Sequence, residues 1–149
     1  MKKISWRIAT LAAILISVAA LICTLFFYEN QPKQVVLEIF GVEIPSSIKI
    51  ESFHTESAWD GRLYYGSLTV SKDRPTGLVD TKNFVPLAKT EDSRVSSLVK
   101  DVNNSFSIST AKLSNPSLLY HKITVKDDSL LVIFYDSDSS EYFFYGTRY

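Results

Sequence analysis

Few side chains in this chain are of the types that perform acid–base chemistry or bind metals. There are two histidines, His54 and His121. His54 and Glu56 are two residues apart in a segment predicted to be a strand, so both side chains project from the same face. With His121 they form a conceivable trio of metal ligands. Metal ligands must converge, and nothing in the spacing brings His121 close, so the pattern favours two half-exposed strand residues and no metal site.

Serines and carboxylates are numerous, but they lack the spacing of catalytic or calcium-binding motifs. No G-x-S-x-G segment frames a serine as a nucleophile elbow. Asp136, Asp138 and Glu141 cluster in DSDSSE, but the central glycine and the distant glutamate of an EF-hand loop are missing. With only five glycines, the chain has no glycine-rich phosphate loop. We therefore expect no catalytic residue, no cofactor and no metal.

Aromatic residues are the one feature that indicates binding. The C-terminal segment EYFFYGTRY holds five of them, and AWDGRLYY holds three. Successive residues of a strand face opposite sides of a sheet, so Tyr142 and Phe144 face one way and Phe143 and Tyr145 the other. If a helix covers only one face, some rings stay exposed and suit partner binding; the alternative is ordinary core packing. The predicted partner surface comprises Trp59, Tyr64, Tyr65, Tyr142 and Tyr145.

The aromatic segments belong to predicted strands. SIKIESFHTE and RLYYGSLTVSK are joined by Asp60-Gly61, a strong hairpin signal because glycine tolerates positive φ. SLLYHKITVK turns at Asp127-Asp128 into SLLVIFYDS, and EYFFYGTRY follows. The continuous apolar run from Leu130 to Tyr135 is typical of a strand buried on both faces.

One helix is predicted between these groups of strands, over 90–103. Thr90 is its expected N-cap, and Glu91 and Asp92 lie in the first turn, where the helix dipole favours acids. The apolar positions recur with helical spacing and define one buried face. They are Val95, Leu98, Val99 and Val102.

The predicted fold class is α+β, with an antiparallel sheet of about five strands and one helix packed on it. Short connections between the strands favour antiparallel pairing. The segment PKQVVLEIFG before the sheet is predicted as a short helix that begins at Pro32 and stops at Gly41, although a strand is nearly as suitable.

The N-terminus holds a run of 20 residues without a charge, Ile8 to Phe27. A helix of this length spans roughly 30 Å, the thickness of the hydrocarbon core of a bilayer. Lys2, Lys3 and Arg7 precede the run, so the N-terminus is expected in the cytoplasm and the rest of the chain outside.

Two alternatives to a retained anchor exist. Ser17 and Ala19 resemble a signal-peptidase site, but cleavage there would leave a strongly hydrophobic new N-terminus. Lipidation of Cys23 requires a small residue directly before it, and Ile22 is large. We therefore expect a cytoplasmic tail at 1–7, a transmembrane signal anchor at 8–27, a juxtamembrane segment at 28–45 and an extracytoplasmic α+β domain at 46–149.

Composition narrows the function classes. From Glu29 onward the chain carries 13 basic and 16 acidic residues, a net charge of −3 without a basic block, which argues against nucleic-acid binding. Cys23 is the only cysteine, so the domain has no disulfide.

This plan of a short tail, one span and a small cysteine-free domain resembles that of small bacterial envelope proteins, which include accessory subunits and immunity proteins. We expect a non-catalytic binding or accessory protein of the inner (cytoplasmic) membrane, whose partners are the membrane and another envelope protein. An immunity-type inhibitor of an exported toxin is the first alternative. An envelope hydrolase is the second and less favoured one.

Overall fold

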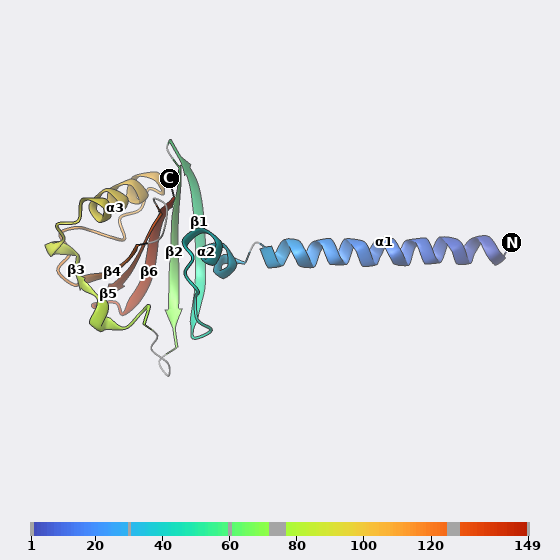
Figure 1. Ribbon diagram of the computed structural model, residues 1–149, viewed down its shortest axis with the longest axis horizontal. Helices are drawn as coiled ribbons and strands as arrows, with labels where there is room; N and C mark the ends of the chain where they lie inside the picture. Colours follow the sequence, from blue (N-terminus) through green and yellow to red (C-terminus); the bar gives the residue numbers. More distant parts are fainter. Residues whose placement is uncertain (1, 30, 60, 72–76, 125–128, 149) are drawn as a thin grey trace. The chain divides into compact units, whose positions relative to one another are not determined.

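The computed structural model describes residues 2–29, 31–59, 61–71, 77–124 and 129–148 (Figure 1). The chain divides into two compact units, Met1–Val35 and Val36–Tyr149. Each is described by itself.

The first unit contains one long helix, α1 (Lys2–Glu29). No side chain between Ile8 and Leu25 is buried, and α1 is the one helix of the described residues that is long and apolar enough to cross a membrane. Its hydroxyls bond within the helix: Ser17 Oγ donates to the Ala13 carbonyl at 2.9 Å and Thr24 Oγ1 to the Ala20 carbonyl at 3.0 Å. These two polar groups are therefore satisfied without water, as a hydrocarbon environment requires.

The second unit is an α+β domain built on one antiparallel sheet, which confirms the predicted fold class. The sheet has six strands rather than about five, because the edge strand β3 is only two residues long and leaves no periodic signal in the sequence. The spatial order is β1 (Ile48–Ala58), β2 (Gly61–Val70), β6 (Glu141–Arg148), β5 (Leu130–Asp136), β4 (Leu118–Thr124) and β3 (Val85–Pro86).

The predicted hairpin between β1 and β2 is present, with Ala58 opposite Gly61. Its connection lies one residue earlier than predicted, since Trp59 is in the turn and Gly61 already belongs to β2. Asp60 lies outside the described residues, as does the predicted turn at Asp127-Asp128.

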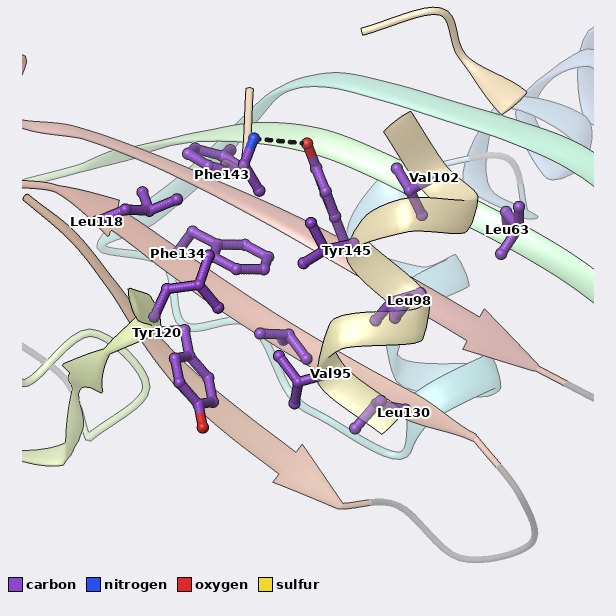
Figure 2. Packing of buried hydrophobic residues seen from close by; sticks show 14 residues of the cluster. Leu63, Val95, Leu98, Val102, Leu118, Tyr120, Leu130, Phe134, Phe143 and Tyr145 are labelled. Carbon is purple, nitrogen blue, oxygen red and sulfur yellow. Dashed lines mark hydrogen bonds between the residues drawn. The ribbon is translucent and has the colours of Figure 1, made fainter. Parts of the chain in front are cut away.

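Helix α3 (Ser93–Ser105) packs on one face of the sheet, through the residues that the sequence predicts (Figure 2). Each of the four is at most 2% exposed. They pack with residues of β2, β4, β5 and β6 in what we call the α3 cluster. Its buried members are Leu63, Leu87, Val95, Leu98, Val99, Val102, Ala111, Leu118, Tyr120, Leu130, Val132, Phe134, Phe143 and Tyr145.

The predicted N-cap of this helix is wrong. Asp92, not Thr90, caps α3, and its carboxylate accepts from the backbone N–H groups of Arg94 at 3.0 Å and Val95 at 3.3 Å. A hydrogen bond from the Lys122 ammonium, together with these backbone bonds, lowers the pKa of Asp92. Thr90 Oγ1 instead pairs with the Tyr120 hydroxyl at 2.8 Å. Asp92 is preferred over Thr90 at the N-cap because its charged carboxylate is stabilised both by the helix dipole and by Lys122.

The opposite face of the sheet is covered as well, as the apolar run of β5 predicts, although the predicted fold has only one helix packed on the sheet. Helix α2 (Pro32–Phe40) forms where helix and strand were nearly equal alternatives, and α2 and α3 lie on opposite sides of the sheet (Figure 1). The buried residues on this side form what we call the α2 cluster. They are Val36, Phe40, Ile48, Tyr64, Leu68, Val79, Phe84, Leu131, Ile133 and Phe144.

Two glycines fit α2 to the sheet. Gly41 ends the helix at φ +62°, in the left-handed region that glycine adopts without strain. Gly146 of β6 leaves room for Phe40, since a Cβ at this position would lie 2.5 Å from Phe40 Cζ. The Phe40 ring also contacts Tyr64 edge to face, with centroids 5.5 Å apart. The Phe40 ring thus packs directly against the backbone of β6 at Gly146.

The predicted strand from Leu130 to Tyr135 is buried on both faces up to Phe134. Leu130, Val132 and Phe134 belong to the α3 cluster, and Leu131 and Ile133 to the α2 cluster. Because each face of β5 is covered by a separate group of side chains, its apolar run does not alternate.

Replacing Leu98 by Asp places a charge inside the α3 cluster. We expect Leu98→Asp to lower the free energy of unfolding by more than about 3 kcal/mol, because the substitution removes a buried leucine and buries an unpaired carboxylate. Urea titration of the detergent-solubilised chain, followed by near-ultraviolet circular dichroism, measures the loss. The control is Lys100→Asp on the exposed side of the same helix, which should cost less than about 1 kcal/mol. Equal effects of the two variants contradict the packing described for α3.

Candidate partner-binding surface

The predicted partner surface divides into buried and exposed residues. Tyr64 is 3% exposed and Tyr145 is 0% exposed, so the expectation that they remain at the surface is wrong. The physical reason is that the sheet is covered on both faces. Tyr64 packs in the α2 cluster and Tyr145 in the α3 cluster, and neither ring can contact a partner without unfolding its surroundings.

The hydroxyl of Tyr145 has a structural role. It accepts a hydrogen bond from the Ala111 backbone N–H at 3.0 Å, drawn as the dashed line in Figure 2, and donates to Asn103 Oδ1 at 2.8 Å. Asn103 Nδ2 in turn donates to the Ala111 carbonyl at 2.7 Å. Burial raises the pKa of Tyr145 to about 12. The network ties the end of α3 and the following segment to β6.

Tyr65 and Tyr142 are half-buried. Tyr65 stacks on His54 with centroids 5.6 Å apart and an interplanar angle of 16°. Tyr142 lies 4.6 Å from Tyr135, centroid to centroid, and burial raises its pKa. These two tyrosines lie on opposite faces of the sheet, because Tyr65 packs against the α3 cluster and Tyr142 against the α2 cluster. They therefore do not form a common surface.

The residues considered for metal binding and catalysis do not converge. His54 stacks on Tyr65, on the α3 side, whereas His121 lies 5.6 Å from the Phe84 ring, on the α2 side. His121 Nδ1 is also 3.2 Å from the Leu78 carbonyl. Among the described residues, no group of three or more His, Cys, Asp or Glu side chains could hold a metal ion.

The acidic segment between β5 and β6 stabilises its own turn. Asp136 Oδ1 accepts from the Asp138 backbone N–H at 3.0 Å, and Asp138 Oδ2 accepts from Ser117 Oγ at 2.6 Å. Glu141 Oε2 accepts from Ser139 Oγ at 3.4 Å. These hydrogen bonds stabilise the turn between β5 and β6, so the three carboxylates have a structural role.

A cavity of about 470 Å³ lies beside this turn on the α2 side. Leu68, Val79 and Tyr142 contribute much of its apolar wall, and Glu141 contributes a carboxylate. It lies at the end of β2 and the start of β6, away from the β1–β2 turn.

Trp59 is the member of the predicted surface that is fully exposed, at 104% of its reference area. It lies in the turn between β1 and β2. At this tip neither cluster of the core includes it. A tryptophan without intramolecular packing exposes a large apolar area to water, which is the property of an anchor residue at interfaces.

The structure adds two residues that the sequence analysis missed. Arg62 is directly opposite Arg148 in the ladder between β2 and β6, and both are exposed. They line a recess of about 390 Å³ with Ile39, Gly61 and Tyr64, which we call the arginine recess. No sequence signal identifies the pair, because the two arginines are 86 positions apart and meet only through strand pairing.

No family model, curated protein or solved structure matches this chain. Function is therefore inferred from the residues and geometry of the chain itself.

The Tyr145 network makes stability depend on alkaline pH. The folded-state pKa of Tyr145 is about 12, above the unfolded value of about 10, so the unfolded chain releases the proton first. The stabilisation is complete below about pH 10 and is lost as the pH rises toward 12, and at pH 11 the loss is about 1 kcal/mol. Urea titrations at pH 7, 9, 10 and 11 measure it.

The matched variant for this measurement is Tyr145→Phe. It should cost about 1–3 kcal/mol at pH 7, because Asn103 Oδ1 and the Ala111 N–H lose their partner, and it should flatten the alkaline dependence. Tyr142→Phe, which removes a less buried phenol, should leave most of that dependence in place. An unchanged slope in Tyr145→Phe contradicts the assignment.

Proposed function

We propose that this chain is a single-pass protein of the inner (cytoplasmic) membrane, with its N-terminus in the cytoplasm and its C-terminal domain outside. In this proposal the domain is non-catalytic and binds another protein of the cell envelope. The length and apolarity of α1 and the exposure of Ile8–Leu25 support the span. Lys2, Lys3 and Arg7 before it support the orientation, because positive flanks stay in the cytoplasm.

The proposed organisation keeps the tail at 1–7 and the span at 8–27. The folded domain is placed from Val36 rather than from 46, since Val36 and Phe40 are each only 1% exposed and belong to the α2 cluster. The linker that remains between the span and the domain is then short. Such a tether holds the domain close to the membrane and raises its effective concentration toward an envelope partner.

The observation that carries the binding role is the exposure of Trp59. Most other aromatic rings of the described domain pack in or against the two clusters, whereas Trp59 contributes nothing to them. Arg62 and Arg148, which are ladder partners of each other at the same end of the sheet, are of a residue type that is enriched with tryptophan at binding hot spots. The contacts of His54, His121 and the acidic turn are those of structural residues, which supports a non-catalytic domain.

The topology is tested with an alkaline phosphatase fusion at the C-terminus. We expect an active fusion that sediments with membranes and resists carbonate extraction, because alkaline phosphatase folds only outside the cytoplasm and α1 remains in the bilayer. Replacing Lys2, Lys3 and Arg7 by Glu should reduce the activity by weakening the orientation signal. A mature protein that begins near Ala20, or one that is soluble after export, contradicts the proposal.

The binding role is tested with Trp59→Ala in a pulldown from detergent-solubilised membranes. We expect partner recovery to fall at least tenfold while the free energy of unfolding changes by less than about 0.5 kcal/mol, since the side chain makes no core contact.

Tyr64→Ala provides the contrast for this variant. It removes a ring from the α2 cluster and should cost about 3–5 kcal/mol. If Trp59→Ala unfolds the domain, Trp59 is part of the core. If it folds and recovers the partner normally, the binding surface lies elsewhere.

A further inference from the structure

The arginine recess brings two positive side chains together at the Trp59 end of the sheet. Arg62 and Arg148 are ladder partners on β2 and β6, and both project toward the α2 side, as Tyr64 does two residues along β2. Ile39 of α2 and Tyr64 supply apolar atoms to the same recess. The recess therefore combines two cationic groups with an apolar wall.

This arrangement is unfavourable for the isolated domain. Like charges directly opposite one another in a sheet destabilise the pair. None of the described residues that line the recess is acidic, and no ion pair within the described residues involves either arginine. Two other cations of the domain do have acidic partners, Lys49 with Glu51 and Lys122 with Asp92.

The domain contains enough acidic residues to supply an ion-pair partner for these arginines. From Glu29 onward the net charge is −3. The two arginines form a local positive region in a domain whose net charge is negative. Such a region favours the binding of a negatively charged ligand.

We propose that the arginine recess binds an aspartate or glutamate side chain on an acidic segment of the protein partner. This inference rests on the proposed function and names the chemistry of the partner. Arginine guanidinium groups are planar and bind carboxylates through two parallel N–H···O bonds, so two arginines on adjacent strands can hold one carboxylate between them or two neighbouring ones. Ile39, which is only partly buried, then contacts the aliphatic part of the acidic residue, and Trp59 contacts an apolar side chain next to it.

The charge of the domain favours a protein over the phospholipid surface as the occupant. An anionic bilayer repels a domain of net charge −3, whereas a short acidic segment meets only the local field of the two arginines. A recess also fits a protruding side chain better than it fits a flat layer of headgroups.

The test uses this chain in cell membranes, with the photoreactive residue p-benzoylphenylalanine in place of Ser57, the exposed ladder partner of Arg62. Irradiation forms an adduct with whatever contacts the tip, and mass spectrometry identifies the adduct. The test variant is Arg62→Glu/Arg148→Glu. The control, Lys89→Glu/Lys112→Glu, makes the same change in net charge at two exposed lysines that do not line the recess. Arg62→Lys/Arg148→Lys keeps the charge and removes the fork geometry.

We expect a protein adduct whose cross-linked peptide carries Asp or Glu, with a yield that falls more than tenfold in the double glutamate variant. The lysine variant should lie between this variant and the parent, the control should equal the parent, and added salt should lower the yield. A phospholipid adduct overturns the proposal, as does a peptide without carboxylates, or an equal loss in test variant and control. An absence of any adduct in the parent chain instead rejects the proposed binding surface at Trp59 itself.

Discussion

The position of β6 between β2 and β5 is the constraint on which the rest of the domain depends. This strand, the last of the described ones, is hydrogen-bonded on both edges and sends aromatic side chains to both faces. Phe143 and Tyr145 build the α3 cluster and Phe144 the α2 cluster. A central strand that is apolar on both sides exposes its rings to water unless both faces are covered, so the domain needs a helix on each side.

Both helices are matched to this strand by local features. On one side Phe40 of α2 is seated on Gly146, where any side chain would collide with it. On the other side the Tyr145 hydroxyl bonds to Asn103 at the end of α3 and to the Ala111 backbone. The first contact depends on the absence of a side chain, and the second on the hydrogen bonds of one hydroxyl within a mostly apolar layer. Buried polar groups are tolerated when their bonds are complete, as they are here.

The coverage of both faces also limits where the domain can bind a partner. The aromatic rings of the strands are buried or half-buried in or against the two clusters, whereas Trp59 at the β1–β2 turn is fully exposed. The same end of the sheet carries Arg62 and Arg148, which no described acid neutralises. An exposed indole and two arginines without an acidic partner among the described residues are costly in isolation and useful in an interface, so we assign binding to this end of the sheet.

The sequence by itself determined the helix that can span a membrane, the α+β class, the buried stripe of α3 and the side of the sheet to which each ring of β6 points. These features follow from local periodicity and composition, which neighbouring residues carry regardless of the rest of the fold. Three features were decided only by the tertiary structure: the burial of Tyr64 and Tyr145, the choice of Asp92 over Thr90 as cap, and the pairing of Arg62 with Arg148. Each depends on a group distant in the chain: α2 over the second face, Lys122 beside the cap, and β6 next to β2. Such contacts form only when the chain folds back on itself, and no local pattern records them.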